Sequence, residues 1–155
     1  MSFIKIFVDT HGSIPSGRWK VIIDRYKSQV TSRLGDEAVT RIRAYLATQY
    51  MYLGNNGGSP QFNPVPIDAG YYQANVRSYR YSPDLALVTD SNVPYGPWLE
   101  GISDANWIIW PHRRNPPPRR FPGYFAFKKV ATQLAVDSEA IAQEELPRYI
   151  GELNA

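Results

Sequence analysis

The sequence predicts a single α+β domain over residues 1–155, in which long N-terminal helices and a C-terminal helix pack on a small antiparallel sheet. Three observations predict this class. Apolar side chains recur at helical spacing in the first third of the chain and again at its end. Between these segments the pattern changes to the period of two that is typical of strands. A length of 155 residues also suits one hydrophobic core.

The chain opens with a predicted strand or arm within residues 1–17. From Phe3 to Val8, aliphatic side chains alternate with aromatic or charged ones, which places the aliphatic ones on one side of a strand. Residues 11–17 have the glycine, serine and proline content of a turn, so we expect the strand to end before them.

Two helical stripes follow the opening strand. The spacing predicts a helix over residues 19–34 and a second over 39–53. Gly35 and Asp36 between them provide a C-terminal stop and a new N-cap, so we expect two consecutive helices or one broken helix. A loop rich in glycine and proline follows, over residues 54–66.

The middle of the chain has a strand pattern. Three short apolar runs are predicted strands, at residues 76–81, 85–88 and 95–100. Turns at Ser82–Asp84 and Asp90–Asn92 separate them. An antiparallel meander of about three strands is the simplest arrangement.

The last third of the chain combines a loop and a helix. A projecting loop rich in proline, tryptophan and arginine is predicted over residues 104–122, and an amphipathic helix is predicted to begin at about Gly123. Pro147 removes one backbone donor, so we expect it to kink or interrupt this helix.

Composition limits the function classes. With 43% hydrophobic and 20% charged residues the chain is expected to fold, and without cysteine it has neither disulfides nor thiolate metal ligands. A net charge of +3 is small for a dedicated nucleic-acid binder. No run of ~18 apolar residues and no signal-peptide core is present, so we expect a soluble protein with no membrane partner, made and assembled in a cytoplasm.

Catalytic chemistry has little support, and we predict that the protein is not an enzyme. His11 and His112 are the only histidines, so no metal and no cofactor is expected. Asp9, His11 and Ser13 are the residue types of a hydrolase triad, but a spacing of two within one segment favours a polar turn. The glycine run at 54–59 lacks the Gly-Lys-Ser/Thr ending of a phosphate loop.

Three short motifs stand out, at Ile67–Tyr72, Val88–Gly101 and Arg119–Phe127. Together they resemble a family of minor structural proteins of siphoviruses, especially those that infect actinobacteria, which is similar to the broader neck and tail-completion group. The order of elements follows this resemblance over residues 18–153.

The resemblance implies a long helix on a small antiparallel sheet, with a C-terminal helix that returns along it. It also implies a virion protein that forms a homo-oligomeric ring, often sixfold, at the head–tail junction, with adjoining neck or tail proteins as partners. Members of the family serve as tail-completion, tail-terminator, neck or minor capsid proteins, so the station in the particle stays open.

The Tyr95–Gly101 segment carries the first candidate contact residues. Its glycines permit tight backbone, its proline discourages edge pairing, and its aromatic rings offer contact area. We expect Tyr95, Trp98 and Glu100 to hold a subunit contact or to anchor the loop that makes one. The alternative is that they pack the local core.

The 104–122 loop carries the other candidates, because aromatic, arginine and proline residues in one stiff segment are hard to explain as core. Three interpretations compete: a docking element for a neighbouring subunit or ring, a lining of the DNA channel, and a solvated loop. The docking candidates are Trp107, Trp110, Arg113, Arg114, Arg119, Arg120 and Phe121. The candidates for non-specific contact with genomic DNA are Arg113, Arg114, Arg119 and Arg120.

The sequence therefore predicts a ring-forming structural protein that joins the connector of a phage head to the tail tube. A tail terminator or a minor capsid protein is the main alternative. A DNA-binding phage protein is a further alternative, which only the basic aromatic loop supports.

Overall fold

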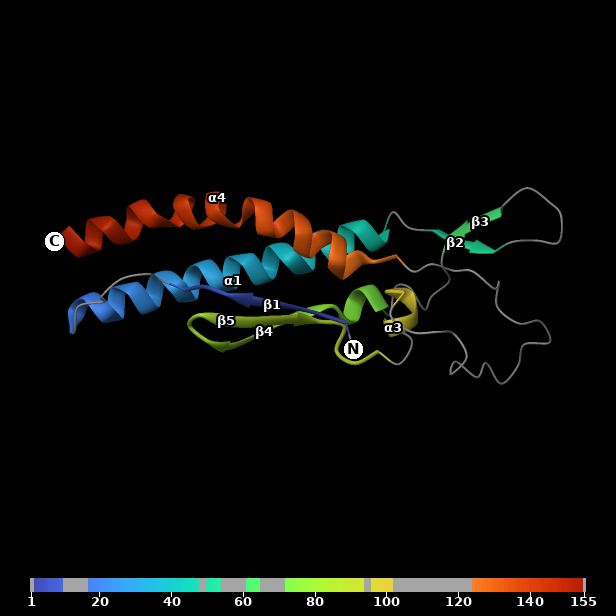
Figure 1. Ribbon diagram of the computed structural model, residues 1–155, viewed down its shortest axis with the longest axis horizontal. Coiled ribbons are helices and arrows are strands. Elements are labelled where there is room, and N and C mark those ends of the chain that lie inside the picture. Colours follow the sequence, from blue (N-terminus) through green and yellow to red (C-terminus); the bar gives the residue numbers. More distant parts are fainter. Residues whose placement is uncertain are drawn as a thin grey trace.

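The computed structural model describes seven stretches of the chain. They are residues 2–9, 17–47, 50–53, 61–64, 72–93, 96–101 and 124–154. For residues 50–53 and 61–64 and for Trp98 it describes the backbone alone. In Figure 1 the two long helices run along one side of a small sheet.

The predicted α+β class is confirmed. Three helices pack on the sheet, namely α1 (Arg18–Ala47), α3 (Gly96–Leu99) and α4 (Ala126–Asn154). The core lies between the long helices and the sheet, where Val30, Ile42, Val76, Val88 and Val130 are almost fully buried. Among the described helices, none is long and apolar enough to cross a membrane.

The main sheet is antiparallel and has the strand order β1-β5-β4. The strands are β1 (Phe3–Phe7), β4 (Arg77–Ser82) and β5 (Leu85–Thr89), which confirms the predicted opening strand and the first two predicted runs. The predicted meander is wrong, because β1 from the start of the chain pairs with β5 and takes the third place.

The third predicted strand, over residues 95–100, is also wrong. Its described part is the short helix α3, in which the backbone N–H of Glu100 donates to Gly96 O at 3.0 Å. Pro97 lies in the first turn of this helix, where its missing donor costs no hydrogen bond. A segment whose backbone groups are satisfied locally needs no strand partner.

Helix α1 is continuous from Arg18 to Ala47, so the expected break at Gly35 and Asp36 is wrong. A Cβ added at Gly35 would lie 2.3 Å from the Oγ atom and 3.3 Å from the Cβ atom of Ser78 on β4. Gly35 therefore allows α1 to lie close to the sheet, and it does not end the helix.

The predicted helix over residues 39–53 ends early, at Ala47. Residues Tyr50–Leu53 instead form strand β2, which pairs antiparallel with β3 (Gln61–Pro64). Tyrosine favours strands, and the glycine-rich run between the two segments suits a hairpin connection. The proline-rich loop predicted for this region therefore contains a strand.

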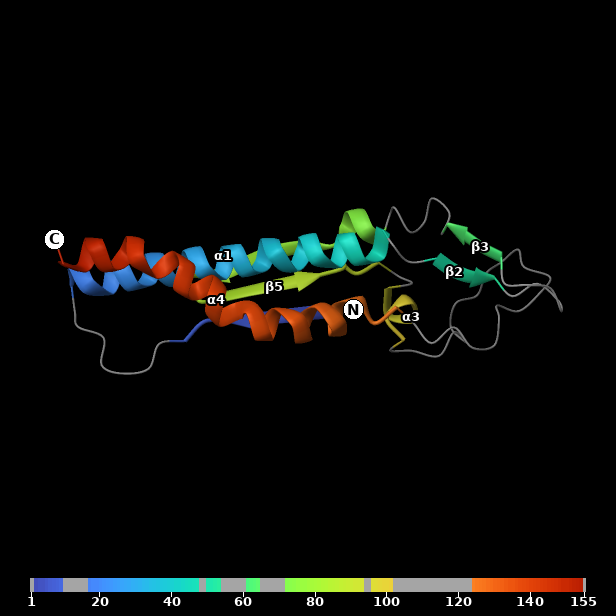
Figure 2. The same ribbon diagram turned by 90° about the horizontal axis from the view of Figure 1, so that it is seen from above.

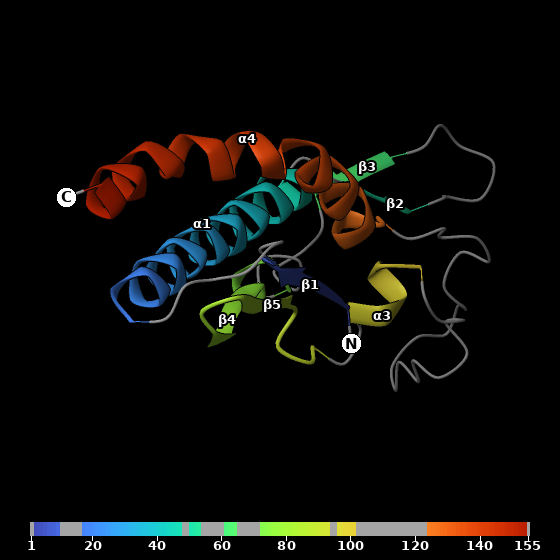
Figure 3. The same cartoon turned by 60° about the vertical axis from the view of Figure 1, so that its left-hand side comes forward.

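Helix α4 confirms the predicted C-terminal helix and runs without interruption through Pro147. It curves along its length, as Figures 2 and 3 show. An exposed proline in the middle of an α-helix removes one hydrogen bond at a place where water can satisfy the freed carbonyl, so the helix continues.

Three groups of ion pairs hold α4 against α1. Arg25 pairs with Glu152 at 2.7 Å, Arg33 pairs with both Glu144 and Glu145, and Arg41 pairs with Asp137. The hydroxyl of Tyr26 also donates to Ala142 O at 3.0 Å. Exposed ion pairs stabilise a fold weakly, so their main effect is to fix the register of the two helices.

Candidate functional site

The described ends of the segment between Gly101 and Tyr124 are held together. The backbone N–H of Tyr124 donates to Leu99 O at 2.6 Å, and the N–H of Phe127 donates to Glu100 Oε2 at 3.0 Å. We call these four residues, Leu99, Glu100, Tyr124 and Phe127, the loop-base clamp. The clamp joins the end of α3 to the start of α4, so it fixes both ends of the segment that contains the predicted 104–122 loop.

The backbone turns sharply on both sides of the clamp. Gly101 has a φ of 67°, and Phe125 has a φ of 55°. Glycine adopts such a left-handed conformation at little cost, whereas a residue with a side chain costs about 1 kcal/mol or more. The second turn is therefore imposed by the contacts around it.

Glu100 is the buried centre of the clamp, with only 2% of its surface exposed. Its Oε1 atom accepts a hydrogen bond from the hydroxyl of Tyr72 at 3.3 Å, and its Oε2 atom accepts the one from Phe127. Burial raises the pKa of Glu100 to about 7, although the hydrogen bond from Phe127 opposes this rise. The nearby carboxylate of Asp90 adds to it.

Asp90 is a second buried acid beside the clamp, and it is fully covered. Its Oδ1 atom accepts a hydrogen bond from the N–H of Asn92 at 3.0 Å, and its Oδ2 atom accepts one from the N–H of Ser2 at 3.3 Å. Asp90 thus ties the start of β1 to the turn that follows β5.

Tyr72 connects the two acids to the core. Its side chain is 1% exposed, and burial together with the nearby charges of Glu100 and Asp90 raises its pKa. The phenol therefore keeps its proton at physiological pH and remains a donor to Glu100.

Close packing explains why position 96 of the Tyr95–Gly101 motif is a glycine. A Cβ at this position would lie 2.1 Å from Asp90 Oδ2 and 3.1 Å from Cε2 of Tyr72. The first residue of α3 therefore lies directly on the buried acid, and this close approach requires a residue without a side chain.

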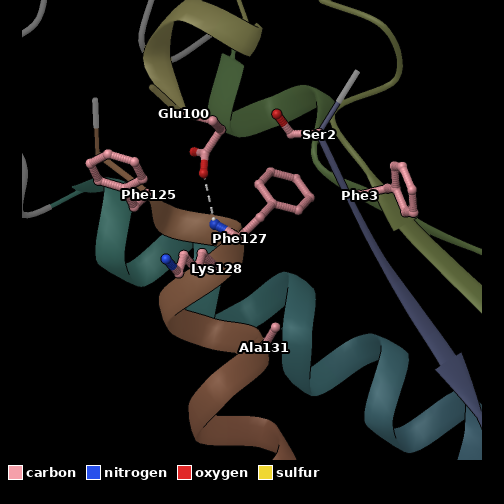
Figure 4. A pocket seen from close by; sticks show the side chains of 7 residues that line it. All are labelled: Ser2, Phe3, Glu100, Phe125, Phe127, Lys128 and Ala131. Atoms are coloured by element: carbon pink, nitrogen blue, oxygen red, sulfur yellow. Dashed lines mark hydrogen bonds between the residues drawn. The ribbon is translucent and has the colours of Figure 1, made fainter. Parts of the chain in front are cut away.

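A pocket of about 330 Å³ opens beside the clamp. Figure 4 shows its lining, which comes from the start of β1, the end of α3 and the first turns of α4. The lining residues are Ser2, Phe3, Glu100, Phe125, Phe127, Lys128 and Ala131. Three of the seven are phenylalanines, and Glu100 and Lys128 are the two charged residues.

A carboxyl with a raised pKa beside a pocket is typical of catalytic sites. In this pocket, however, both oxygens of Glu100 accept hydrogen bonds from groups of the fold. This arrangement indicates that Glu100 anchors the start of α4. It does not favour a role in which Glu100 exchanges protons with a substrate. Among the described residues, no three potential metal ligands of the His, Cys, Asp or Glu type gather at one point.

The structure locates two of the ten predicted site residues. Glu100 is enclosed by its own chain, so it anchors the loop base and does not itself present a contact surface. Trp98 lies in α3, and its backbone alone is described. The other eight lie outside the described residues, namely Tyr95, Trp107, Trp110, Arg113, Arg114, Arg119, Arg120 and Phe121.

The sequence interpretation missed the partners of Glu100. Asp90 appeared only as a turn residue, and Tyr72 only as the end of the Ile67–Tyr72 motif. A signal existed, since Tyr72 and Asp90 both belong to the motifs that carry the family resemblance. In three dimensions these two residues and the described part of the third motif meet at one point.

Comparisons with known proteins identify no relative of the chain. It matches no protein-family description, no curated protein and no solved structure.

Proposed function

We propose that the protein is a structural subunit of a long-tailed bacteriophage particle. In this proposal it assembles into a ring at the head–tail junction and joins the connector to the tail tube, as a neck or tail-completion protein does. The particle is its final location, and the host cytoplasm is where it assembles. The proposal begins from the resemblance of three motifs to siphovirus structural proteins.

The loop-base clamp is the observation that carries the proposal. It joins the described parts of the Val88–Gly101 and Arg119–Phe127 motifs by two hydrogen bonds, from Tyr124 to Leu99 and from Phe127 to Glu100. A clamp of this kind gives a long loop a fixed origin on a rigid body. A docking element needs such an origin, because the loop then loses less conformational entropy when it binds its partner.

The chemistry of the clamped segment favours docking to protein. Tryptophan and arginine are the residues that most often dominate binding energy at interfaces, and the 104–122 segment contains two and four of them. Prolines also stiffen the segment, which reduces the entropy lost on docking. Four arginines are few for a DNA-binding surface, so contact with genomic DNA is the weaker alternative.

Imaging and protein identification in purified phage particles test the proposal. The expected result is a symmetric ring of this chain between the head and the tail tube. A chain that is absent from purified particles and monomeric in solution would contradict it. A ring located at the far end of the tail tube or on the head shell would identify a terminator or a minor capsid protein instead.

Substitutions in the loop separate docking from DNA contact. The variant with Trp107→Ser and Trp110→Ser is expected to yield heads and tails that fail to join, whereas Trp19→Ser on α1 is a control that leaves joining intact. If the loop contacts DNA instead, replacing the four arginines by serine removes a salt-dependent electrophoretic shift. Joining that survives the tryptophan changes contradicts the docking role.

A further inference from the structure

Strand β1 lies at an edge of the main sheet, and no described strand pairs with its second side. The strand order is β1-β5-β4, so β5 is the one neighbour of β1 in this sheet. At the two ends of this pair, the N–H of Val8 donates to Asp84 O at 2.9 Å, and the N–H of Asp90 donates to Ser2 O at 3.4 Å. Successive residues of an antiparallel strand direct their backbone groups alternately to one side and to the other. The even-numbered residues of β1 therefore bond to β5.

The odd-numbered residues of β1 direct their backbone groups away from β5. They are Phe3, Lys5 and Phe7, and we call the row of their N–H and carbonyl groups the free edge of β1. No described backbone group bonds to this row. Such a row binds an extended chain, which adds to the sheet as a further strand. The free edge therefore determines the backbone conformation of a partner.

The opposite edge of the sheet is protected against strand addition. β4 has an irregular register between Arg80 and Ser82, and the side chains of Arg77 and Arg80 are exposed. Bulges and charged residues are features by which sheet edges avoid pairing. β1 instead has a regular register, and its outward rings Phe3 and Phe7 are 58% and 60% exposed. β1 is therefore the edge that can accept a partner.

The pocket beside the loop-base clamp lies along the same strand. Ser2 and Phe3 line it from β1, and Phe127, Lys128 and Ala131 line it from α4. Figure 4 shows these side chains between the start of β1 and the first turns of α4, and Figure 2 shows this half of α4 along the β1 side of the sheet. A strand added to β1 would direct every second side chain to the helix side of the sheet. A pocket of about 330 Å³ with phenylalanine walls suits one such side chain if it is apolar.

The exposed charges at the free edge and at the pocket are basic. Lys5 is exposed at the centre of β1, and Lys128 is exposed where it lines the pocket. Glu100 is the one acid of the pocket lining, but it is buried and both its oxygens accept hydrogen bonds. The nearest exposed acid along the strand is Asp9, two residues beyond the end of β1. An acidic residue opposite Lys5 would therefore form a favourable cross-strand pair.

We propose that the free edge of β1 binds an extended segment of a different protein, in which an acidic residue lies opposite Lys5 and apolar residues flank it. The apolar residues on the outer side pack on Phe3 and Phe7, and one side chain on the helix side fills the pocket. Strand addition requires neither a ring nor a phage particle, so its test is independent of the proposed function.

The edges of the main sheet in a second copy fit less well than an acidic segment. Two β1 strands paired antiparallel around their centres would place Lys5 opposite Lys5, and like charges directly opposite each other are destabilising. The β4 edge contributes Arg77 and Arg80, which are also cations. Lys5 therefore selects against pairing between these edges and in favour of a partner that supplies an acid.

A short peptide with the proposed pattern is the probe. It contains valine, leucine, glutamate, leucine and valine in this order, between two threonines and with both ends capped, and a control peptide has lysine in place of the glutamate. Fluorescence anisotropy is expected to show at least ~5-fold tighter binding of the glutamate peptide, because an opposite-charge pair replaces a like-charge pair. In the Lys5→Glu variant this preference is expected to reverse. The side chain of Lys5 is exposed, so the change leaves the core intact.

Amide hydrogen exchange followed by NMR distinguishes strand addition from simple apolar contact. At saturating glutamate peptide the amides of Phe3, Lys5 and Phe7 are expected to exchange at least ~10-fold more slowly than in the free protein. The amides of Ile4 and Ile6 face β5 and serve as the internal reference. A peptide with an N-methyl group on the amide of its glutamate lacks the donor that faces β1, and it is expected to bind at least ~5-fold more weakly.

A change in the pocket tests the side chain that enters it. Ala131→Phe places a ring in the pocket and is expected to weaken binding of the glutamate peptide about tenfold, because an apolar side chain of the peptide then stays in water. Ala135→Phe, at an exposed position one turn further along α4, is the matched control and is expected to bind as the original chain does. Circular dichroism checks that both variants fold. Binding that Ala131→Phe leaves unchanged would overturn the role of the pocket.

Three results would overturn the strand addition itself. One is a glutamate peptide that does not bind at about 1 mM, where even weak complexes are half formed. Another is binding that neither the N-methyl group nor Lys5→Glu alters. The third is slow exchange of the Phe3, Lys5 and Phe7 amides in the protein without peptide. If that slow exchange is independent of protein concentration, the chain covers its own edge, and if it grows with concentration, a second copy covers it.

Discussion

Glu100→Gln tests whether the centre of the loop-base clamp is a buried carboxyl that holds its proton near neutrality. In the unfolded chain the group titrates near its ordinary pKa of 4.5, whereas burial raises the folded pKa to about 7. Between these pH values the folded chain binds a proton that the unfolded chain has released. The contribution of Glu100 to stability is therefore full below the unfolded pKa, and it falls as pH rises toward the folded one.

The size of the effect follows from the two pKa values. One pKa unit corresponds to about 1.4 kcal/mol, so the rise from 4.5 to about 7 amounts to about 3 kcal/mol of stability lost by pH 8. The glutamine amide keeps an acceptor for the N–H of Phe127 and carries no charge. Glu100→Gln is therefore expected to exceed the original chain by only about 1 kcal/mol at pH 5 and by about 3 kcal/mol at pH 8.

Urea denaturation followed by circular dichroism at pH 5, 6, 7 and 8 measures this difference. Glu139→Gln, at an exposed position of α4, is the matched control for the loss of one carboxyl. Other groups that titrate between pH 5 and 8 are the same in both chains, so they cancel in the comparison. If the difference in unfolding free energy between Glu100→Gln and the original chain does not change with pH, Glu100 does not have a raised pKa in the folded protein.

Three further substitutions test the packing around the two long helices and α3. Gly35→Ala is expected to cost about 1–3 kcal/mol of unfolding free energy because the new methyl group meets Ser78, and a second change of Ser78 to glycine should recover much of that loss in a double-mutant cycle. Gly96→Ala should cost about 2 kcal/mol or more of unfolding free energy, because Asp90 accepts hydrogen bonds on both oxygens and cannot move aside. Loss of the clamp in this variant would appear as faster proteolysis of the 102–123 segment. Pro147→Ala should raise the melting temperature, because proline in a helix interior costs about 3 kcal/mol relative to alanine. Proline also lowers the entropy of the unfolded chain, but this offsets only part of that cost. An unchanged melting temperature would contradict this prediction.

Periodic segments of the sequence predicted the structure well. β1, β5 and α4 each have a clear period of two or 3.6, because each buries one face against the same core. The α+β class followed from these segments alone. Periodicity describes only the residues along one element, however, and it contains nothing about the element that packs on it.

The predicted secondary structure was wrong where a residue contacts a part of the chain that is distant in sequence. Gly35 has the composition of a helix end, but its purpose is the close approach of α1 to Ser78, which lies 43 positions further along the chain. Residues 95–100 have apolar character because α3 packs its leucine into the core, where Leu99 is 3% exposed. A strand and a short buried helix give the same apolar run, so no local pattern distinguishes them.

The candidate site was only partly predictable for the same reason. Glu100 was chosen because it belongs to a motif, and the structure places it in the clamp. Its partners Tyr72 and Asp90 lie 28 and 10 positions away, so their meeting depends on how β4, β5 and α3 are arranged. The rings of Phe3 and Phe7 were likewise visible in the alternation of β1, but which side of the strand α1 and α4 cover depends on the tertiary arrangement.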